Sequence, residues 1–300
     1  MQKSFVLILA IAALVGICLL ITNQNKKAPG EYEIGILETA SFPPLDDAKN
    51  GFIEEMHKQY GDKVKIIVQN AQGSLSQAQA IATSYKANKD IDAFYAIATP
   101  ALEALMQQIK DRPILFAAVT NPKLLHIDDG HTNITGCTDM ADIAKEIQVM
   151  HQNLPHVKKI SILHSSGEPN SVYLTNLMKN ELEKYHIQTE EDVANGISEV
   201  SAAALHAASN TDAILIPTDN TMAASLSMIL QIAKKENKPV IVTWTGEQKS
   251  PYMQFGVNYR CSGKIVANQI IKILKEKISP ISLPIQSPSP DVIINIKEIL

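Results

Sequence analysis

The sequence has little of what marks a nucleic-acid-binding protein or a familiar enzyme. Its 300 residues include 27 lysines and arginines against 31 acidic residues, which gives a net charge of −4 and no excess of positive charge for a nucleic acid. It contains no G-x-x-x-x-G-K-[ST], G-x-G-x-x-G, G-x-S-x-G or H-E-x-x-H motif. These absences predict a protein that is not an enzyme, needs no cofactor and binds no nucleic acid.

One uncharged apolar run, Phe5–Ile21, stands apart from an otherwise ordinary composition. Lys3 precedes it and a polar stretch follows it, which is the pattern of a signal peptide or signal anchor. Residues 1–30 are therefore predicted to lie outside the folded part, to attach it to the membrane and to make it extracytoplasmic. Cys18 is a candidate for lipidation, although Ile17 before it is unusually large. Lipidation, an uncleaved anchor and free release all stay open.

The rest of the sequence alternates strand and helix patterns. At its centre, the apolar strand pattern of Thr211–Asn220 leads into a helical pattern at Thr221–Lys235. A similar unit begins at Asp92, and in it Thr99 takes the position that Asp219 holds in the later unit. Alternating strands and helices predict parallel sheets with right-handed crossovers, and the length is enough for two lobes. We therefore predict an α/β fold of two doubly wound parallel-sheet lobes.

The end of the chain indicates how the lobes are joined. The helical pattern at Cys261–Lys277 has no further strand and helix series after it, so we expect it to return to the first lobe. The chain then crosses between lobes near Ile134–Thr138, near Phe255–Tyr259 and within Ile281–Pro290, and these crossings form a multi-strand hinge. The predicted division is residues 31–136 with 259–283 in the first lobe, and 137–258 with 284–300 in the second.

Side chains at the carboxyl ends of parallel strands converge where open α/β sheets bind ligands. The polar candidates there are Gln69, Asn70, Thr99, Thr120, Asn170, Ser171, Asp219 and Asn220. Their alternative role is local, since such residues also cap helices and hold turns. The aromatic candidates are Phe42, Tyr259 and the only tryptophan, Trp244. Each ring can either stack on an aromatic solute or pack in the core or hinge.

Two further patterns have two interpretations each. The first pattern is the close spacing of His126, Asp128, Asp129 and His131, which suggests a metal-binding loop. A solvated polar loop between the lobes accounts for it better, so we predict no metal. Cys137 and Cys261 each follow a predicted crossing, and an exported protein permits a disulfide between them if their backbones come close enough. The alternative is two unrelated small residues.

Short phrases of the sequence follow one another in the order of a known family. They are Gly35-Ile-Leu37, Val68-Gln-Asn-Ala-Gln-Gly73, Ala96-Ile-Ala-Thr-Pro100, Ala118-Val-Thr-Asn-Pro122, Asn133-Ile-Thr-Gly136, Gly167-Glu-Pro-Asn-Ser171, Pro217-Thr-Asp-Asn220 and Val292-Ile-Ile-Asn-Ile296. With them, the chain from about residue 33 to its end resembles the tryptophan/tyrosine-type substrate-binding proteins of ABC transporters, which have the type I periplasmic-binding fold. It departs from them at Trp244-Thr-Gly-Glu247 and after Leu37. Both stretches are expected to line the ligand.

The resemblance implies an extracytoplasmic monomer that captures a small solute and presents it to an ABC permease and its ATPase. The expected solute is an aromatic amino acid such as tryptophan, tyrosine or phenylalanine. Thr99 and Thr120 would then donate to its carboxylate, and Asp219 would accept from its ammonium. A branched amino acid or a nucleoside-like compound is the alternative solute. A sensory ectodomain of a signalling complex is the alternative function.

Overall fold

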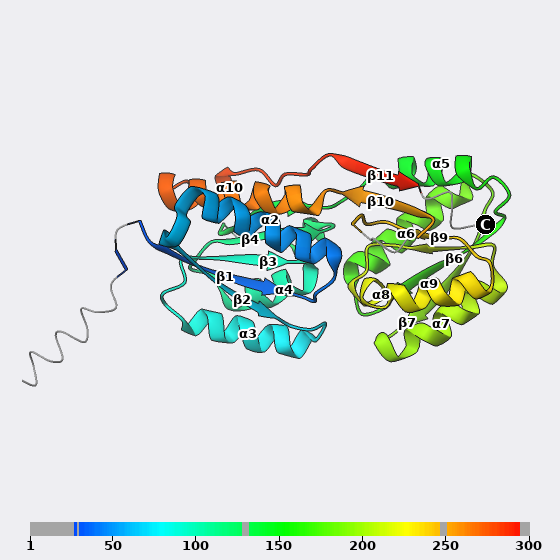
Figure 1. Ribbon diagram of the computed structural model, residues 1–300, viewed down its shortest axis with the longest axis horizontal. Coiled ribbons are helices and arrows are strands. Elements are labelled where there is room, and N and C mark those ends of the chain that lie inside the picture. Colours follow the sequence, from blue (N-terminus) through cyan, green and yellow to red (C-terminus); the bar gives the residue numbers. More distant parts are fainter. Residues whose placement is uncertain (1–26, 29, 128–131, 247–250, 295–300) are drawn as a thin grey trace, which may run out of the picture.

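The computed structural model describes residues 27–294 except residues 29, 128–131 and 247–250. The predicted signal segment therefore lies almost wholly outside the described residues, and so does Cys18. Within them, the chain forms two α/β lobes, each with helices on both faces of a sheet (Figure 1). The predicted α/β class with two parallel-dominated sheets is confirmed.

The first sheet is parallel throughout and has the order β2-β1-β3-β4-β5. Its strands are β1 (Tyr32–Glu38), β2 (Val64–Asn70), β3 (Ala93–Ile97), β4 (Ile114–Val119) and β5 (Ile134–Thr138). Helices α2 (Pro43–Tyr60) and α10 (Tyr259–Glu276) cover one face, and α3 (Leu75–Ala87) and α4 (Thr99–Gln108) cover the other (Figure 1). Short 3₁₀ turns occupy Gly61–Lys63, Pro122–Leu125 and Pro280–Ser282. A buried apolar cluster fills each face.

The second sheet has the order β11-β10-β9-β8-β6-β7, and only β11 runs antiparallel to its neighbour. Its strands are β6 (Lys159–Ser165), β7 (Gln188–Ala194), β8 (Ala213–Ile216), β9 (Val240–Val242), β10 (Met253–Val257) and β11 (Pro290–Ile294). Its helices are α5 (Ile143–Asn153), α6 (Pro169–Glu183), α7 (Ile197–Asn210), α8 (Asn220–Ala224) and α9 (Leu226–Lys235). The single helix predicted at Thr221–Lys235 is therefore wrong, because the chain breaks at Ser225 (φ −102°, ψ 1°) into two helices.

Helix α10 packs along α2 although about 200 residues separate them, and two glycines permit the close approach. A Cβ atom on Gly263 would lie 2.0 Å from the carbonyl oxygen of Ala48, and one on Gly51 would lie 2.2 Å from that of Arg260. Arg260 also forms ion pairs with Asp47 at 3.2 Å and with Glu54. The last long helix thus belongs to the first sheet's helical layer.

The described chain passes between the sheets at three places: residues 139–142, Asn258 and residues 283–289. The first and third crossings lie side by side, since Thr138 N–H donates to Gln286 O at 2.8 Å and Gln286 N–H donates to Gly136 O at 3.0 Å. Strand β5 continues to Thr138 before the first crossing begins. We therefore propose the division predicted from the sequence, with its first boundary moved from residue 136 to residue 138.

Cys137 and Cys261 are both free thiols, so the disulfide considered from the sequence is not formed. Cys137 is fully buried at the end of β5, whereas Cys261 is exposed in the first turn of α10. Burial raises the pKa of the Cys137 thiol to about 12. Cys261 follows the crossing at Asn258 as predicted, whereas Cys137 lies in β5 just before the crossing at residues 139–142. The alternative of two unrelated small residues is the one that the structure shows.

Candidate functional site

A pocket lies between the lobes, at the carboxyl ends of strands from both sheets. The residues that line it from the first lobe are Phe42, Pro44, Leu45 and Ala118; those from the second are Asn170, Thr218, Asp219, Asn220, Ala223 and Trp244; Asp139 and Tyr259 line it from the crossings. Parallel sheets place their ligand sites at this edge, because side chains after neighbouring strands converge there.

Asp219 organises the polar edge of the second lobe. Its carboxylate accepts hydrogen bonds from Ser165 N–H at 2.6 Å, from the Ser171 hydroxyl at 2.7 Å and from Met222 N–H at 2.9 Å. The last bond makes Asp219 the N-cap of α8, as the local alternative from the sequence proposed. Burial and the nearby charge of Glu168 raise the pKa of Asp219 to about 7. The side chain both caps a helix and faces the pocket.

Glu168 fixes the same edge from behind, and sequence reasoning missed it. Its two carboxylate oxygens accept bonds from the backbone and side chain of Asn220 at 2.9 and 2.7 Å, and from those of Thr221 at 2.9 and 2.8 Å. Asn220 is therefore held by its amide while it lines the pocket. A glutamate just before Pro169 carries no pattern that would predict this reach across the sheet.

Asn170 presents an acceptor with no partner. Its Nδ2 donates to Thr218 O at 2.8 Å, which fixes the orientation of the amide. Its Oδ1 is buried and has no hydrogen-bond partner among the described residues, and the side chain lines the pocket. An unpaired buried acceptor costs free energy, so this oxygen is suited to a donor on a bound solute.

Asp139 brings a second carboxyl to the pocket from the first crossing. Its Oδ2 accepts from the Tyr259 hydroxyl at 3.0 Å, and its Oδ1 has no hydrogen bond of normal geometry to the described residues. Burial raises the pKa of Asp139, and the hydroxyls of Tyr259 and Thr120 lower it in part. The sequence placed the crossing a few residues earlier, so Asp139 was not among the predicted site residues.

The first lobe contributes an apolar wall built on unusual backbone. Ala98 follows β3 and Ala118 is the last but one residue of the neighbouring β4; their φ values are positive, 75° and 57°, and Ala118 lines the pocket. Ala98 also has ψ 163°, a region that is essentially restricted to glycine. Such strain persists where the surroundings fix it, and it collects at ligand sites.

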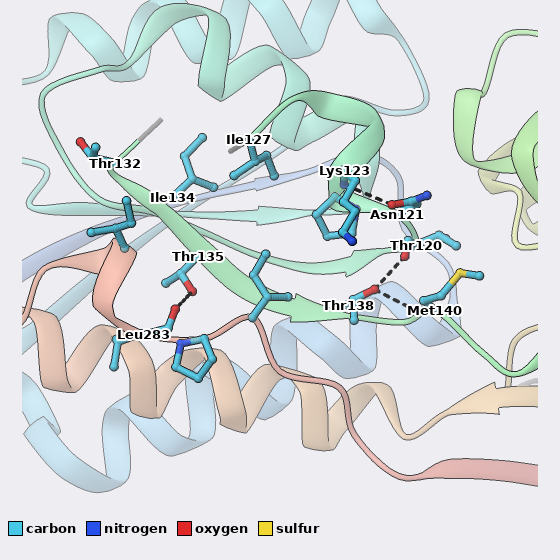
Figure 2. Close-up of a pocket in the computed structure, with 14 residues that line it drawn as sticks. Thr120, Asn121, Lys123, Ile127, Thr132, Ile134, Thr135, Thr138, Met140 and Leu283 are labelled. Carbon is cyan, nitrogen blue, oxygen red and sulfur yellow. Dashed lines mark hydrogen bonds between the residues drawn. The ribbon is translucent and has the colours of Figure 1, made fainter. Parts of the chain in front are cut away.

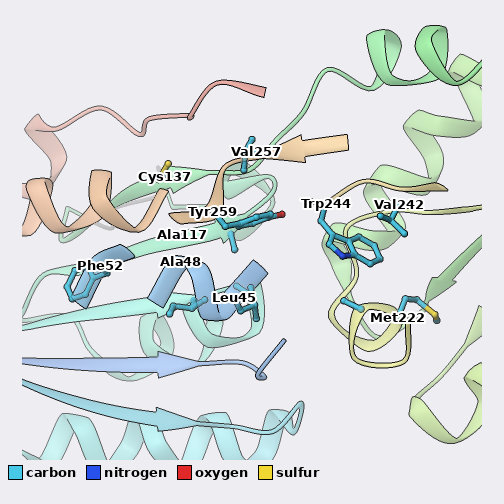
Figure 3. Packing of buried hydrophobic residues seen from close by; sticks show 14 of the residues in the cluster. Leu45, Ala48, Phe52, Ala117, Cys137, Met222, Val242, Trp244, Val257 and Tyr259 are labelled. Atoms are coloured by element: carbon cyan, nitrogen blue, oxygen red, sulfur yellow. The ribbon is translucent and has the colours of Figure 1, made fainter. Parts of the chain in front are cut away.

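The aromatic candidates join this wall to the second lobe. Trp244 and Tyr259 are only 2 % and 4 % exposed, and Phe42 is half-buried. Figure 3 shows Tyr259 extending toward the side on which Trp244 lies, and both belong to a buried cluster that spans the two lobes. All three rings thus line the pocket, and Trp244 and Tyr259 also pack as buried side chains, while stacking on a solute stays a prediction.

Five predicted residues do not line this pocket. Thr99 is buried as the first residue of α4, and Ser171 lies fully buried beneath Asp219. Gln69 and Asn70 end the edge strand β2, where Asn70 donates to Glu38 at 2.7 Å and accepts from Gln72 N–H. Asn70 therefore holds a turn, as its local alternative proposed.

Thr120, the fifth, borders a separate cavity of about 560 Å³ between β5 and the third crossing (Figure 2). Its hydroxyl is buried without a hydrogen bond of normal geometry to the described residues, and its carbonyl oxygen accepts from the Thr138 hydroxyl at 2.7 Å. Thr120 is linked to the pocket through Asp139, because the Thr120 hydroxyl lowers the pKa of that lining residue.

Of the residues that the structure describes, no group of three or more His, Cys, Asp and Glu side chains could hold a metal ion. The suggested metal loop lies mostly outside the described residues, since only His126 of its four members is described. No helix in the described part of the chain is long and apolar enough to cross a bilayer.

Residues 33–300 match the family model of the ABC transporter substrate binding protein. The chain belongs to this family. It is 31 % identical over 268 residues to a tyrosine-binding protein of Clostridioides difficile (strain R20291), a match that covers 85 % of this chain and 77 % of the relative. Proteins of this family bind small solutes outside the cytoplasm for a transporter, and the predicted resemblance is thus confirmed.

Two solved structures of such proteins are similar to this chain. One is an ABC domain in complex with L-Trp from Streptococcus pneumonia, with 25 % identity and a TM-score of 0.84. The other is the ligand-free, open structure of a substrate-binding protein with adhesive properties from Clostridium difficile, with 26 % identity and a TM-score of 0.64. Each match covers 89 % of this chain and 93 % of the other. The predicted type I periplasmic-binding fold is confirmed.

Proposed function

We propose that this chain is the extracytoplasmic binding protein of an ABC importer. It captures a small solute in the pocket between its lobes and presents it to a permease and its ATPase. Family membership supports the transport role. The observation that carries the proposal is the pocket itself, because both lobes and two crossings supply its lining. A solute bound there holds the lobes together, and the permease can distinguish the closed form from the open one.

We propose an aromatic amino acid as the solute. The relatives named above bind tyrosine and L-Trp. In this chain, three rings line a pocket that also holds buried acceptors, which suits an aromatic side chain joined to an ammonium group. The Thr99 and Thr120 hydroxyls stay proposed donors for the carboxylate of the solute. Asn220 and Ser171 stay proposed site residues. Gln69 and Asn70 would act only at the rim of the site.

The described conformation supports a binding site that closes. The chain superposes better on the L-Trp complex than on the open, ligand-free relative, with TM-scores of 0.84 and 0.64. Trp244, Tyr259 and Asp219 are each less than 5 % exposed. Solvent does not reach these side chains, so a solute must gain access by separation of the lobes.

A thermal-shift screen with the twenty amino acids tests this function. A solute present at 100 times its dissociation constant should stabilise the protein by about 2.7 kcal/mol, which raises the melting temperature by several degrees. Trp244 fluorescence should change with the same solutes, since the only tryptophan lines the pocket. If no amino acid at millimolar concentration shifts the melting temperature, the amino-acid assignment is wrong. Branched amino acids and nucleosides belong in the same screen.

A further inference from the structure

The described residues that line the pocket bring acceptors to it but no cationic side chain. Among the described residues that line it, none is lysine, arginine or histidine, whereas Asp139 and Asp219 both bring carboxyl groups. A free amino acid carries one positive and one negative group. This lining provides charge complementarity for the positive group only, because no side chain here offers a cation to a carboxylate.

The two carboxyl groups differ in how far the protein itself satisfies them. Asp219 already accepts three hydrogen bonds, two of them from backbone N–H groups, and its oxygens hold β6, α6 and α8 together. These donors stabilise the carboxylate within the protein before any solute binds. Its removal would disturb the second lobe whether or not it touches the solute.

Asp139 is only 4 % exposed, and the partners that other residues bring to it are hydroxyl groups rather than backbone N–H groups. The Tyr259 hydroxyl donates to its Oδ2 at 3.0 Å and the Thr120 hydroxyl also lowers its pKa, but no hydrogen bond of normal geometry reaches its Oδ1 from the described residues. The Oδ1 of Asn170, also unpaired and buried, lines the same pocket. A buried carboxyl without a counter-charge is costly, and a cation on the solute would remove that cost.

We propose that Asp139 is the residue that binds the ammonium of the solute, with Asn170 Oδ1 as a second acceptor. This inference rests on the proposed function. It names the class of ligand as aromatic primary amines. A carboxylate on the ligand itself is favourable for binding but not required. It also separates the two acids: Asp139 recognises the solute, and Asp219 holds the second lobe in shape.

The position of Asp139 gives this contact a consequence for the hinge. Asp139 lies in the first crossing, and its partner Tyr259 follows the second crossing as the first residue of α10. An ammonium on Asp139 Oδ1 therefore engages a pair that already links two crossings. Binding and closure are thus coupled through residues that touch both the solute and the hinge.

Calorimetry on the parent protein tests the ligand class without any substitution. For the aromatic amino acid with the highest affinity, the probes are that amino acid, the amine without its carboxylate, and the arylpropanoate without its ammonium. For phenylalanine these are phenethylamine and 3-phenylpropanoate. We expect the amine to bind at least about tenfold more tightly than the arylpropanoate, as an unpaired buried charge requires. Tighter binding of the arylpropanoate would overturn the proposal.

Asp139→Asn tests the residue. The amide still accepts from Tyr259 but carries no charge, so affinity for the amino acid and the amine should fall at least about 30-fold. The melting temperature without solute should stay equal or rise, because an uncompensated buried carboxyl is gone. Asp142→Asn is the matched control: it removes the same charge three residues later, keeps an N-cap for α5 and lies outside the pocket lining.

The outcomes separate the two proposals. Affinity within threefold of the parent in Asp139→Asn overturns the assignment while the proposed function stands. A similar loss of affinity in Asp142→Asn would also overturn it, since the effect would then come from the net charge of the segment. If the parent binds no amino acid or amine at all, the proposed function fails and the assignment fails with it.

Discussion

Asp219 and Thr99 hold the same position in two similar strand, turn and helix units, but the two lobes use that position differently. In the second lobe Asp219 caps α8 and ties three segments together with hydrogen bonds. In the first lobe Thr99 is already the first residue of α4, and the cap position falls to Ala98 with its positive φ of 75°. One lobe shapes its edge with satisfied polar groups, and the other shapes its edge with strained backbone.

Replacement of Asp219 should show the largest difference between the lobes. Asp219→Ala leaves three buried donors unpaired and removes an N-cap, so we expect the free energy of unfolding to fall by about 4 kcal/mol. Thr99→Ala is the matched change in the first lobe and should cost no more than about 1 kcal/mol, because its side chain caps nothing. Urea unfolding measures both. Equal losses would contradict the division of roles.

Ala98 tests the strained backbone of the first lobe. A β-branched side chain is strongly disfavoured at this φ, and the site is 2 % exposed, so Ala98→Val should lower the free energy of unfolding by about 3 kcal/mol. Ala98→Gly accepts the conformation without strain and should change stability by less than about 1 kcal/mol. The same urea experiment distinguishes them. A valine variant as stable as the parent would show that this backbone is not strained.

Buried glutamates extend the comparison to pH. Glu38 in the first lobe has Lys49 at 2.9 Å and Asn70 at 2.7 Å, whereas Oε2 of Glu146 in the second lobe has no partner among the described residues. Burial, and to a lesser extent the charge of Asp142, raises the pKa of Glu146 from 4.5 to about 8.

The folded protein thus keeps a proton on Glu146 that the unfolded chain releases above pH 4.5. This group therefore favours folding most at low pH, and stability falls as the pH rises from about 4.5 to about 8. Between pH 5 and pH 7 this group should lower the free energy of unfolding of the parent by about 2–3 kcal/mol, and Glu146→Gln should abolish that decrease. Melting temperatures across this range measure it. A variant with the parent's pH slope would show that Glu146 does not titrate in this way.

A pair of asparagines at strand ends should give the smallest effect and the sharpest test of position. Asn170→Ala removes an unpaired acceptor from the pocket and should weaken solute binding about tenfold, or about 1.4 kcal/mol. Asn70→Ala disturbs only a turn at the edge of the first sheet and should change affinity less than twofold. Calorimetry with the same solute measures both. A larger loss for Asn70 would place the site elsewhere.

The sequence predicted the features that depend on local pattern. Alternating apolar strands and amphipathic helices specify the two sheets. Asp219, Asn220, Asn170, Phe42, Trp244 and Tyr259 line the pocket because strand ends converge in a parallel sheet. Asp139 and Glu168 escaped because their roles arise from contacts across 120 and 52 residues of chain. The local spacing of apolar and polar residues does not predict contacts between residues so far apart in the sequence.

Helix α10 has a further consequence through its packing on α2. The first lobe's outer apolar layer includes Val266, Ala267 and Ile270 of α10, while its sheet ends at Thr138. As the chain emerges from its N-terminus, the first five strands are complete long before the helix that covers them. We expect the first half to leave exposed the part of this face that α2 does not cover until about residue 276 has been made, and so to depend on chaperones or on the growing second lobe for protection from aggregation.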